Sequence, residues 1–210
     1  MSSTFIKNCL RGDVKTGLGA CNKQFFGAKK PYLLQRNKTI SLTNGVLSEA
    51  TYNQLIQKGE LIDLGDVISI EDLTIEAQTV EISRIPHKIG NAIYGFKLNF
   101  KGYSCNKDAY KNAENGKWDL IWADKKGNLV CLPVDENTLK GLKIESLYFE
   151  RLTIFNPEDI AKFSFNIYLS EKASEDLEEN GDILDVSNIE TELLDKQGII
   201  DVNISRITST

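Results

Sequence analysis

This chain contains a single histidine, His87, and lacks the short motifs that usually mark an enzyme. Histidine is the common general base and metal ligand near neutral pH, so a catalytic triad or a histidine-based metal centre has little to be built from. The sequence has no GxxxxGK[ST] loop, no GxSxG elbow and no DxDxDG calcium loop. These absences predict a protein with no catalytic residues, no cofactor and no metal site. His87 follows Pro86 and is expected in a turn or on the surface.

Cysteine is also scarce, because the 210 residues contain only four cysteines and no CxxC pair. Such wide spacing does not build a disulfide framework, so we expect reduced, partly buried thiols. The sequence also lacks an apolar run of about 18 residues, which a membrane-spanning helix requires. The first residues lack the apolar stretch of a secretory signal. We therefore expect synthesis in the cytoplasm and no membrane partner.

The net charge of −5 is distributed unevenly. Residues 1–38 contain eight basic residues and one acid, whereas residues 171–185 contain seven acids and one lysine. Either both segments are simply solvated, or the basic segment of one copy binds the acidic segment of the next. The second interpretation gives the candidate interface residues Lys29, Lys30, Arg36, Lys38, Glu175, Asp176, Glu178 and Glu179. The negative overall charge argues against sequence-specific nucleic-acid binding.

The chain divides by composition into an arm and a folded domain. Residues 1–45 are rich in glycine and lysine, with short apolar clusters only, which predicts an extended N-terminal arm. Residues 46–210 carry regular apolar patterns and form the expected domain. Within it, residues 171–197 are so acidic that we expect a long loop.

One helix is well marked at residues 48–58. Ser48 is a good N-cap, and Tyr52 and Leu55 share one face of the helix. Gly59 follows the last periodic residue, as expected of a residue just past a helix end. A second, short polar helix is expected at residues 105–114.

From residue 61 the apolar pattern changes to a period of two, which is typical of half-buried strands. Gly127 and Asn128 are expected to supply positive φ angles in a tight turn at residues 124–128. The fold class that follows is mainly β (α+β), a β-sandwich or barrel with one packed helix. The expected strands are 39–43, 61–64, 67–71, 73–77, 80–83, 96–100, 118–123, 129–132, 143–155, 161–170 and 199–207.

Two stretches resemble a known group of structural proteins. Residues 91–100 read Asn-Ala-Ile-Tyr-Gly-Phe-Lys-Leu-Asn-Phe, and residues 117–130 contain an acidic-Lys-x-Gly-Asn hairpin. On these stretches, residues 75–207 resemble virion structural proteins of tailed phages and prophages of Bacteroidetes bacteria, often tail or tail-tube proteins. The resemblance implies a β-sandwich or barrel whose strands join copies into a ring or tube, and it implies no active site.

The expected function is therefore that of a non-enzymatic virion subunit of the tail-tube type. Its partners would be copies of itself and other virion proteins, and its location the virion. Three alternatives stay open: a head, neck or decoration protein, a monomeric carbohydrate- or protein-binding module, and an assembly chaperone or immunity-type inhibitor. Trp118 and Trp122 motivate the binding module, because sugars stack on exposed aromatic rings. Both share strand parity with Leu120, however, which favours a place in the core.

Overall fold

The computed structural model describes residues 27–82, 84–101, 113–135, 137–150, 162–180, 182–184 and 189. In chain order the elements are β1 (Ala28–Gln35), β2 (Ile40–Ser41), α1 (Glu49–Gln57), β3 (Leu61–Asp63), β4 (Val67–Asp72), β5 (Thr79–Ile82), β6 (Ile85–Lys88), β7 (Gly95–Lys101), β8 (Trp118–Asp124), β9 (Leu129–Asp135), β10 (Thr138–Lys140), β11 (Leu142–Phe149), β12 (Lys162–Leu169), α3 (Glu171–Asn180) and β13 (Asp182–Leu184). The predicted mainly β class is confirmed. The predicted helix at 105–114 and the strand at 199–207 lie mostly or wholly outside the described residues.

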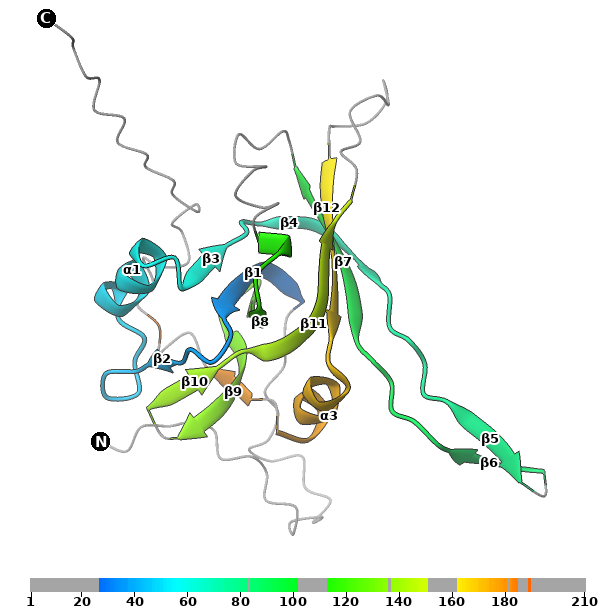
Figure 1. Cartoon of the computed structure of the whole chain (residues 1–210). Helices are drawn as coiled ribbons and strands as arrows, with labels where there is room; N and C mark the ends of the chain where they lie inside the picture. Colours follow the sequence, from blue (N-terminus) through cyan, green and yellow to red (C-terminus); the bar gives the residue numbers. More distant parts are fainter. Residues whose placement is uncertain are drawn as a thin grey trace, which may run out of the picture.

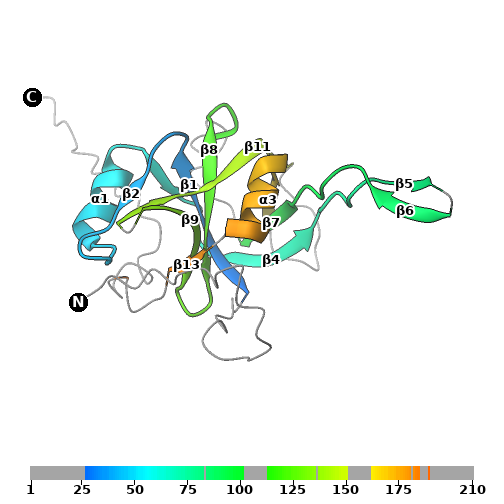
Figure 2. The same cartoon turned by 90° about the horizontal axis from the view of Figure 1, so that it is seen from below.

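The strands form an open barrel (Figures 1 and 2). The larger sheet follows the order β2-β10-β9-β8-β11-β12-β7-β4, while β1 pairs with both β8 and β3, and β13 pairs with β9. The sheet curls until β4 lies near β1. The Leu64 N–H, directly after β3, donates to the Pro31 carbonyl at 3.3 Å and extends the antiparallel β1–β3 pairing. Because β3 leads into β4, this pairing holds β4 beside β1.

Strands β1 and β8 are buried on both faces, because each separates two apolar clusters. Tyr32 and Leu34 of β1 belong to the cluster under α1, while Leu33 belongs to the cluster inside the barrel. In β8, Ile121 faces the first cluster and Trp122 the second, so the predicted core position of the tryptophan is confirmed. A strand that is buried on both faces needs apolar residues at successive positions, which explains the uninterrupted apolar runs in β1 and β8.

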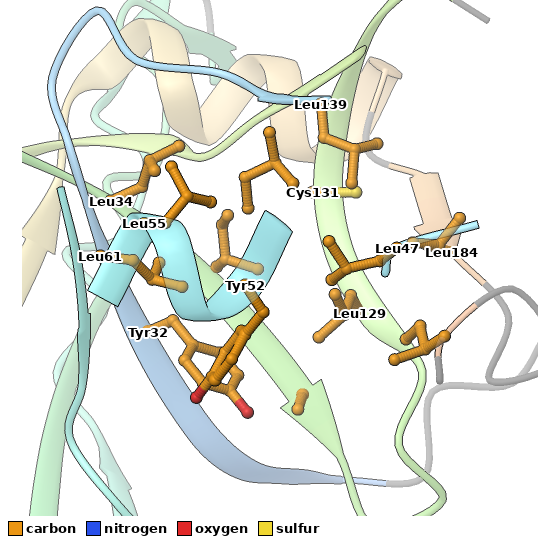
Figure 3. Packing of buried hydrophobic residues seen from close by; sticks show 14 of the residues in the cluster. Tyr32, Leu34, Leu47, Tyr52, Leu55, Leu61, Leu129, Cys131, Leu139 and Leu184 are labelled. Atoms are coloured by element: carbon orange, nitrogen blue, oxygen red, sulfur yellow. The ribbon is translucent and has the colours of Figure 1, made fainter. Parts of the chain in front are cut away.

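Helix α1 forms as predicted and covers the first cluster. The Ser48 hydroxyl accepts a hydrogen bond from the Thr51 N–H at 3.2 Å, and Gly59 after the helix has a φ of 67°. The Tyr52 and Leu55 side chains are buried against β1, with the Tyr52 ring edge-on to Tyr32 at a centroid distance of 6.2 Å (Figure 3). The helix thus closes the outer side of the β1–β8 wall.

The predicted arm at residues 1–45 is wrong from residue 28 onward. Residues 28–35 form β1, a central strand in which Leu33 and Leu34 are fully buried. The lysines around this strand suggested a solvated segment, but one of them, Lys30, is itself buried. Residues 1–26 lie outside the described residues.

The predicted acidic loop at residues 171–197 is also wrong in its first part, because residues 171–180 form α3. Ser170 caps this helix, since its hydroxyl accepts from the Ala173 N–H at 3.2 Å. Only Ala173 and Leu177 give the helix an apolar face toward the barrel cluster, so its acidic composition hid the pattern.

The turn at residues 124–128 forms, with one corrected detail. Gly127 has a φ of 92°, as predicted, but Asn128 is not among the described residues with positive φ. The Asn128 N–H and side-chain amide instead donate to the Asp124 carboxylate at 2.9 and 2.8 Å. The turn is thus stabilised by a buried carboxylate.

Residues 73–94 form a long ribbon that leaves the barrel, not wall strands as predicted. The chain continues from β4 through the bridge between Ile75 and Ile93 to the β5–β6 pair. All residues of β5 and β6 are exposed. Figures 1 and 2 show this ribbon extending away from the body in both views.

Gly95, at the point where the ribbon returns to the barrel, makes a close contact that no larger residue permits. It pairs with Tyr168 of β12, and a Cβ at Gly95 would lie 2.7 Å from both the Leu73 carbonyl oxygen and the Tyr168 ring. The tyrosine ring therefore covers the bare backbone of its cross-strand partner.

We predict that Gly95→Ala lowers the free energy of unfolding by about 1–3 kcal/mol, because the backbone or the ring must move. Denaturant unfolding measures this. Gly90→Ala is the matched control, since a Cβ there meets nothing nearer than Gln78 at 3.6 Å. Equal stability of the two variants would contradict the prediction.

Candidate assembly surfaces

Among the described residues, the four strands β4-β7-β12-β11 have two open edges, namely the outer side of β4 and the part of β11 beyond its short pairing with β8. Their three pairings are all antiparallel, and β4 is the last strand of the path. At the other end, β11 pairs with β8 only through Leu142 and Lys143. Beyond these two residues, no described strand lies beside β11 on the side away from β12. Unpaired strand edges favour pairing with another chain.

Two side chains form hydrogen bonds with backbone groups along the open edge of β11. The Glu150 N–H donates to the Ser164 carbonyl of β12, so by strand alternation the N–H groups of Leu147 and Phe149 point to the open side. The Phe149 N–H donates to the Glu114 carboxylate, and the Ile144 carbonyl accepts from the Arg36 guanidinium. The edge is therefore capped at both ends.

Arg36 fills the fork where β8 and β11 separate. Its guanidinium also donates to the Trp118 carbonyl of β8 at 3.3 Å, and its Nε lies 3.5 Å from an Asp119 carboxylate oxygen. Burial raises the pKa of Asp119, although the nearby guanidinium opposes this. The predicted interface residue Arg36 thus binds groups of its own chain.

The face of this sheet that points away from the barrel core is polar. Asn99, Ser164 and Asn166 are buried on it, and the Ser164 hydroxyl donates to the Asn99 side chain at 2.6 Å. Lys97 lies 2.9 Å from Glu150, and this contact lowers the pKa of Glu150 and raises the pKa of Lys97. Its polar side chains therefore largely satisfy one another.

The β5–β6 ribbon carries an exposed apolar face. Val80 pairs with His87, and Ile82 pairs with Ile85, so their side chains lie on one side of the ribbon. Ile82, Ile85 and Ile89 are 55%, 59% and 63% exposed. Because apolar side chains are grouped on a projecting element, this face of the ribbon is a candidate binding surface.

Helix α3 holds the base of this ribbon. The Tyr94 N–H donates to the Ser174 hydroxyl at 3.1 Å, and the Tyr94 hydroxyl donates to Glu178 at 3.0 Å, which raises the pKa of Tyr94. The Asn91 amide donates to Glu175. Two of the predicted acidic interface residues therefore fix the ribbon to the body.

Lys30 forms a buried ion pair with Asp63, 2.9 Å from its carboxylate, and the two side chains are 5% and 2% exposed. The same carboxylate accepts from the Tyr52 hydroxyl at 3.1 Å and from the Gly65 N–H at 2.8 Å. Burial, followed by the charge of Asp63, raises the pKa of both Tyr32 and Tyr52 well above the usual range. A lysine held in this way is not available to a neighbouring copy.

The remaining predicted interface residues are nearer the surface. Lys29 lies 3.7 Å from Asp66, and Lys38 lies 2.6 Å from Glu60. Asp176 lies in α3, and the side chain of Glu179 is outside what the structure describes. All four basic candidates thus have acidic partners within the chain, and the structure does not bring the basic and acidic groups together.

Sequence reasoning did not select Glu114, Asp63 or Ser174. Glu114 contacts a backbone 35 positions away, which no local pattern indicates. Asp63 offered a weak sign, because an acid directly followed by Leu64 and Gly65 is typical of a strand end with a carboxylate-capped turn.

The described part of the chain holds no group of three or more histidine, cysteine, aspartate or glutamate side chains placed to bind a metal. No described helix has the length and apolar character needed to cross a membrane. Trp122 is buried and the Trp118 indole donates to the Ala113 carbonyl at 2.7 Å, so neither ring forms an open sugar platform.

No family model matches the chain, and none of the curated proteins matches it. Among solved structures, the chain is similar to a crystal structure of an Hcp protein, at 10% identity and a TM-score of 0.31, over 69% of this chain and 88% of that one. A TM-score this low establishes no function, so the function must follow from the residues of the chain.

We predict that Lys30→Met lowers the free energy of unfolding by about 3–5 kcal/mol, because the buried Asp63 loses its ammonium partner. Lys29→Met is the matched control and should cost less than about 1 kcal/mol, since its ion pair is solvent-exposed. Denaturant unfolding of both variants measures the difference. A similar loss in the free energy of unfolding for the two variants would show that the buried ion pair contributes no more to stability than the exposed one.

We also predict that Tyr94→Phe combined with Ser174→Ala loosens the ribbon. The double variant removes two bonds to α3, so the local opening free energy at the Ile75 and Ile93 amides should fall by about 1–2 kcal/mol. Hydrogen exchange of these amides is the measurement. Lys172→Ala, an exposed change in the same helix, should leave the exchange unchanged. Unaltered exchange in the double variant would exclude a bracing role for α3.

Proposed function

We propose that this chain is a non-enzymatic structural subunit of a tailed-phage virion, and that copies of it assemble into rings that stack into a tail tube. The observation that carries the proposal is that, among the described residues, the four-stranded sheet β4-β7-β12-β11 has one open edge on β4 and another on part of β11. In the virion, its other partners would be the proteins that start and end the tube.

The strand directions of this sheet suit a ring. Because four strands alternate in direction, β4 runs antiparallel to β11. When copies are related by rotation about an axis along the strands, β4 of the next copy meets β11 in an antiparallel arrangement. Contacts between two different surfaces of this kind close into rings. An odd number of strands would have forced a parallel junction.

The faces of the two edges also match. Ile70 of β4 and Leu147 and Phe149 of β11 are only partly buried against the barrel cluster. On the opposite face, β4 presents Ser69 and Glu71. Joining the edges would therefore continue an apolar face and a polar face from copy to copy, and it would complete the burial of the edge residues.

The other two surfaces have natural places in such an assembly. The polar sheet face with its mutually satisfied charges would line the bore, where excess positive charge would hold back DNA phosphates. The β5–β6 ribbon leaves the body and would bury its apolar face on a copy in the adjacent ring. Its attachment to α3 fixes the direction in which it reaches.

The first test is light scattering after size exclusion, with negative-stain imaging of the same fractions across a range of protein concentrations. Rings or tubes are the expected result. A species of 23.5 kDa at every concentration, with no rings on the grid, would contradict the proposal.

We predict that Leu147→Pro abolishes ring formation. Proline lacks the N–H that Leu147 directs to the open edge, and an edge strand tolerates proline without loss of its inner pairing. Leu147→Ala is the matched control, because it removes the same side chain but keeps the N–H group. Imaging should show rings for the alanine variant only, while circular dichroism shows both folded. Rings formed by the proline variant would exclude pairing through this edge.

A further inference from the structure

We propose that Glu114 is a guard of the open β11 edge, which β4 of a second copy must displace before it can pair. This inference rests on the proposed function and concerns the regulation of the same surface. The Glu114 carboxylate accepts the Phe149 N–H, the group to which a carbonyl of an added strand would bind. A carboxylate oxygen thus occupies the position of the missing strand.

The guard is held in place by a tight corner of the chain. Ala113, next to Glu114, is buried, and its carbonyl accepts from the Gly116 N–H at 3.0 Å and from the Trp118 indole at 2.7 Å. A Cβ at Gly116 would lie 2.2 Å from the indole nitrogen, so the corner requires glycine. Glu114 is therefore presented to β11 by a fixed turn and not by a loose surface contact.

The other cap, Arg36, is expected to keep its hydrogen bonds when a second strand pairs with β11. It binds two carbonyl groups and lies beside Asp119, so removing it would expose several buried polar groups. Glu114 is only half-buried, and water can solvate a released carboxylate. Between the two caps, Leu147 alone directs a free N–H and carbonyl outward in the described part of the edge. One such position is too little for strand addition, so pairing must begin with the release of Glu114.

A cap on the β11 edge protects the monomer from pairing with wrong strands. An open edge joins indiscriminately to other strands, and natural proteins protect edges with charged side chains. A carboxylate that caps an N–H satisfies the group while the chain is a monomer. An incoming carbonyl must compete with this carboxylate for the Phe149 N–H, so pairing loses part of the free energy of one hydrogen bond. The guard therefore lowers the affinity of the edge for any single short strand, while a full β4 edge with several backbone bonds can still displace it.

The test uses a fluorescent peptide of residues 66–73, Asp-Val-Ile-Ser-Ile-Glu-Asp-Leu, and the full chain at a concentration where it is monomeric. Fluorescence anisotropy measures the binding, and hydrogen exchange reports protection of the Leu147 amide. Glu114→Ala should bind the peptide on the order of tenfold more tightly than the unchanged chain, because no acceptor competes for the Phe149 N–H. Glu114→Gln keeps an acceptor at the same position and should bind like the unchanged chain.

Three results would overturn the inference: no peptide binding to any variant, equal or weaker binding by Glu114→Ala, or a gain for Glu114→Gln equal to that of the alanine variant. Thermal unfolding confirms that each variant is folded, and Glu114→Ser replaces Glu114→Ala if the latter is not. The proposed function is judged separately by imaging. Peptide binding with the expected gain but no rings would refute the tube and keep the guard, whereas rings with no effect of Glu114 would do the reverse.

Discussion

The ion pair between Lys30 and Asp63 is the contact on which the arrangement of this molecule depends. Lys30 lies in β1 and Asp63 at the end of β3, so the pair joins these two neighbouring strands beside the Leu64–Pro31 backbone bond. A buried pair is costly to form, and breaking it leaves an uncompensated charge, so the geometry around it is strongly specified. With β3 fixed there, β4 takes its place at the sheet end and the ribbon leaves the barrel from a defined point.

Several charged side chains of the described residues are paired within the chain. Lys30 joins β1 to β3, Arg36 fills the fork between β8 and β11, and Glu178 with Glu175 holds the ribbon. Association between copies through the basic and acidic segments stays a prediction. In the proposed assembly, backbone edges and the apolar ribbon face join the copies, and neither depends strongly on salt, unlike exposed charge pairs.

Elements with a local cause were predictable from the sequence, and elements with a distant cause were not. Helix α1 follows from the Ser48 cap and the spacing of Tyr52 and Leu55, and the turn after β8 follows from Gly127. Strand β1 was missed because burial on both faces removes the period of two. The contact of Glu114 with Phe149 joins residues far apart in the chain, so only the folded barrel reveals the edge and its cap.

The two kinds of assembly surface differ in direction, and this explains why only one of them is capped. Apolar burial is non-directional, so in the proposed assembly the exposed isoleucines of the ribbon need only a complementary apolar surface and can be left uncovered on the projecting ribbon. Strand pairing is directional and strong over a whole edge, so an uncapped edge would trap copies in a wrong register. In the proposed assembly, contact through the ribbon brings copies together first. Pairing at β11 then follows only where an approaching β4 is held long enough to replace Glu114.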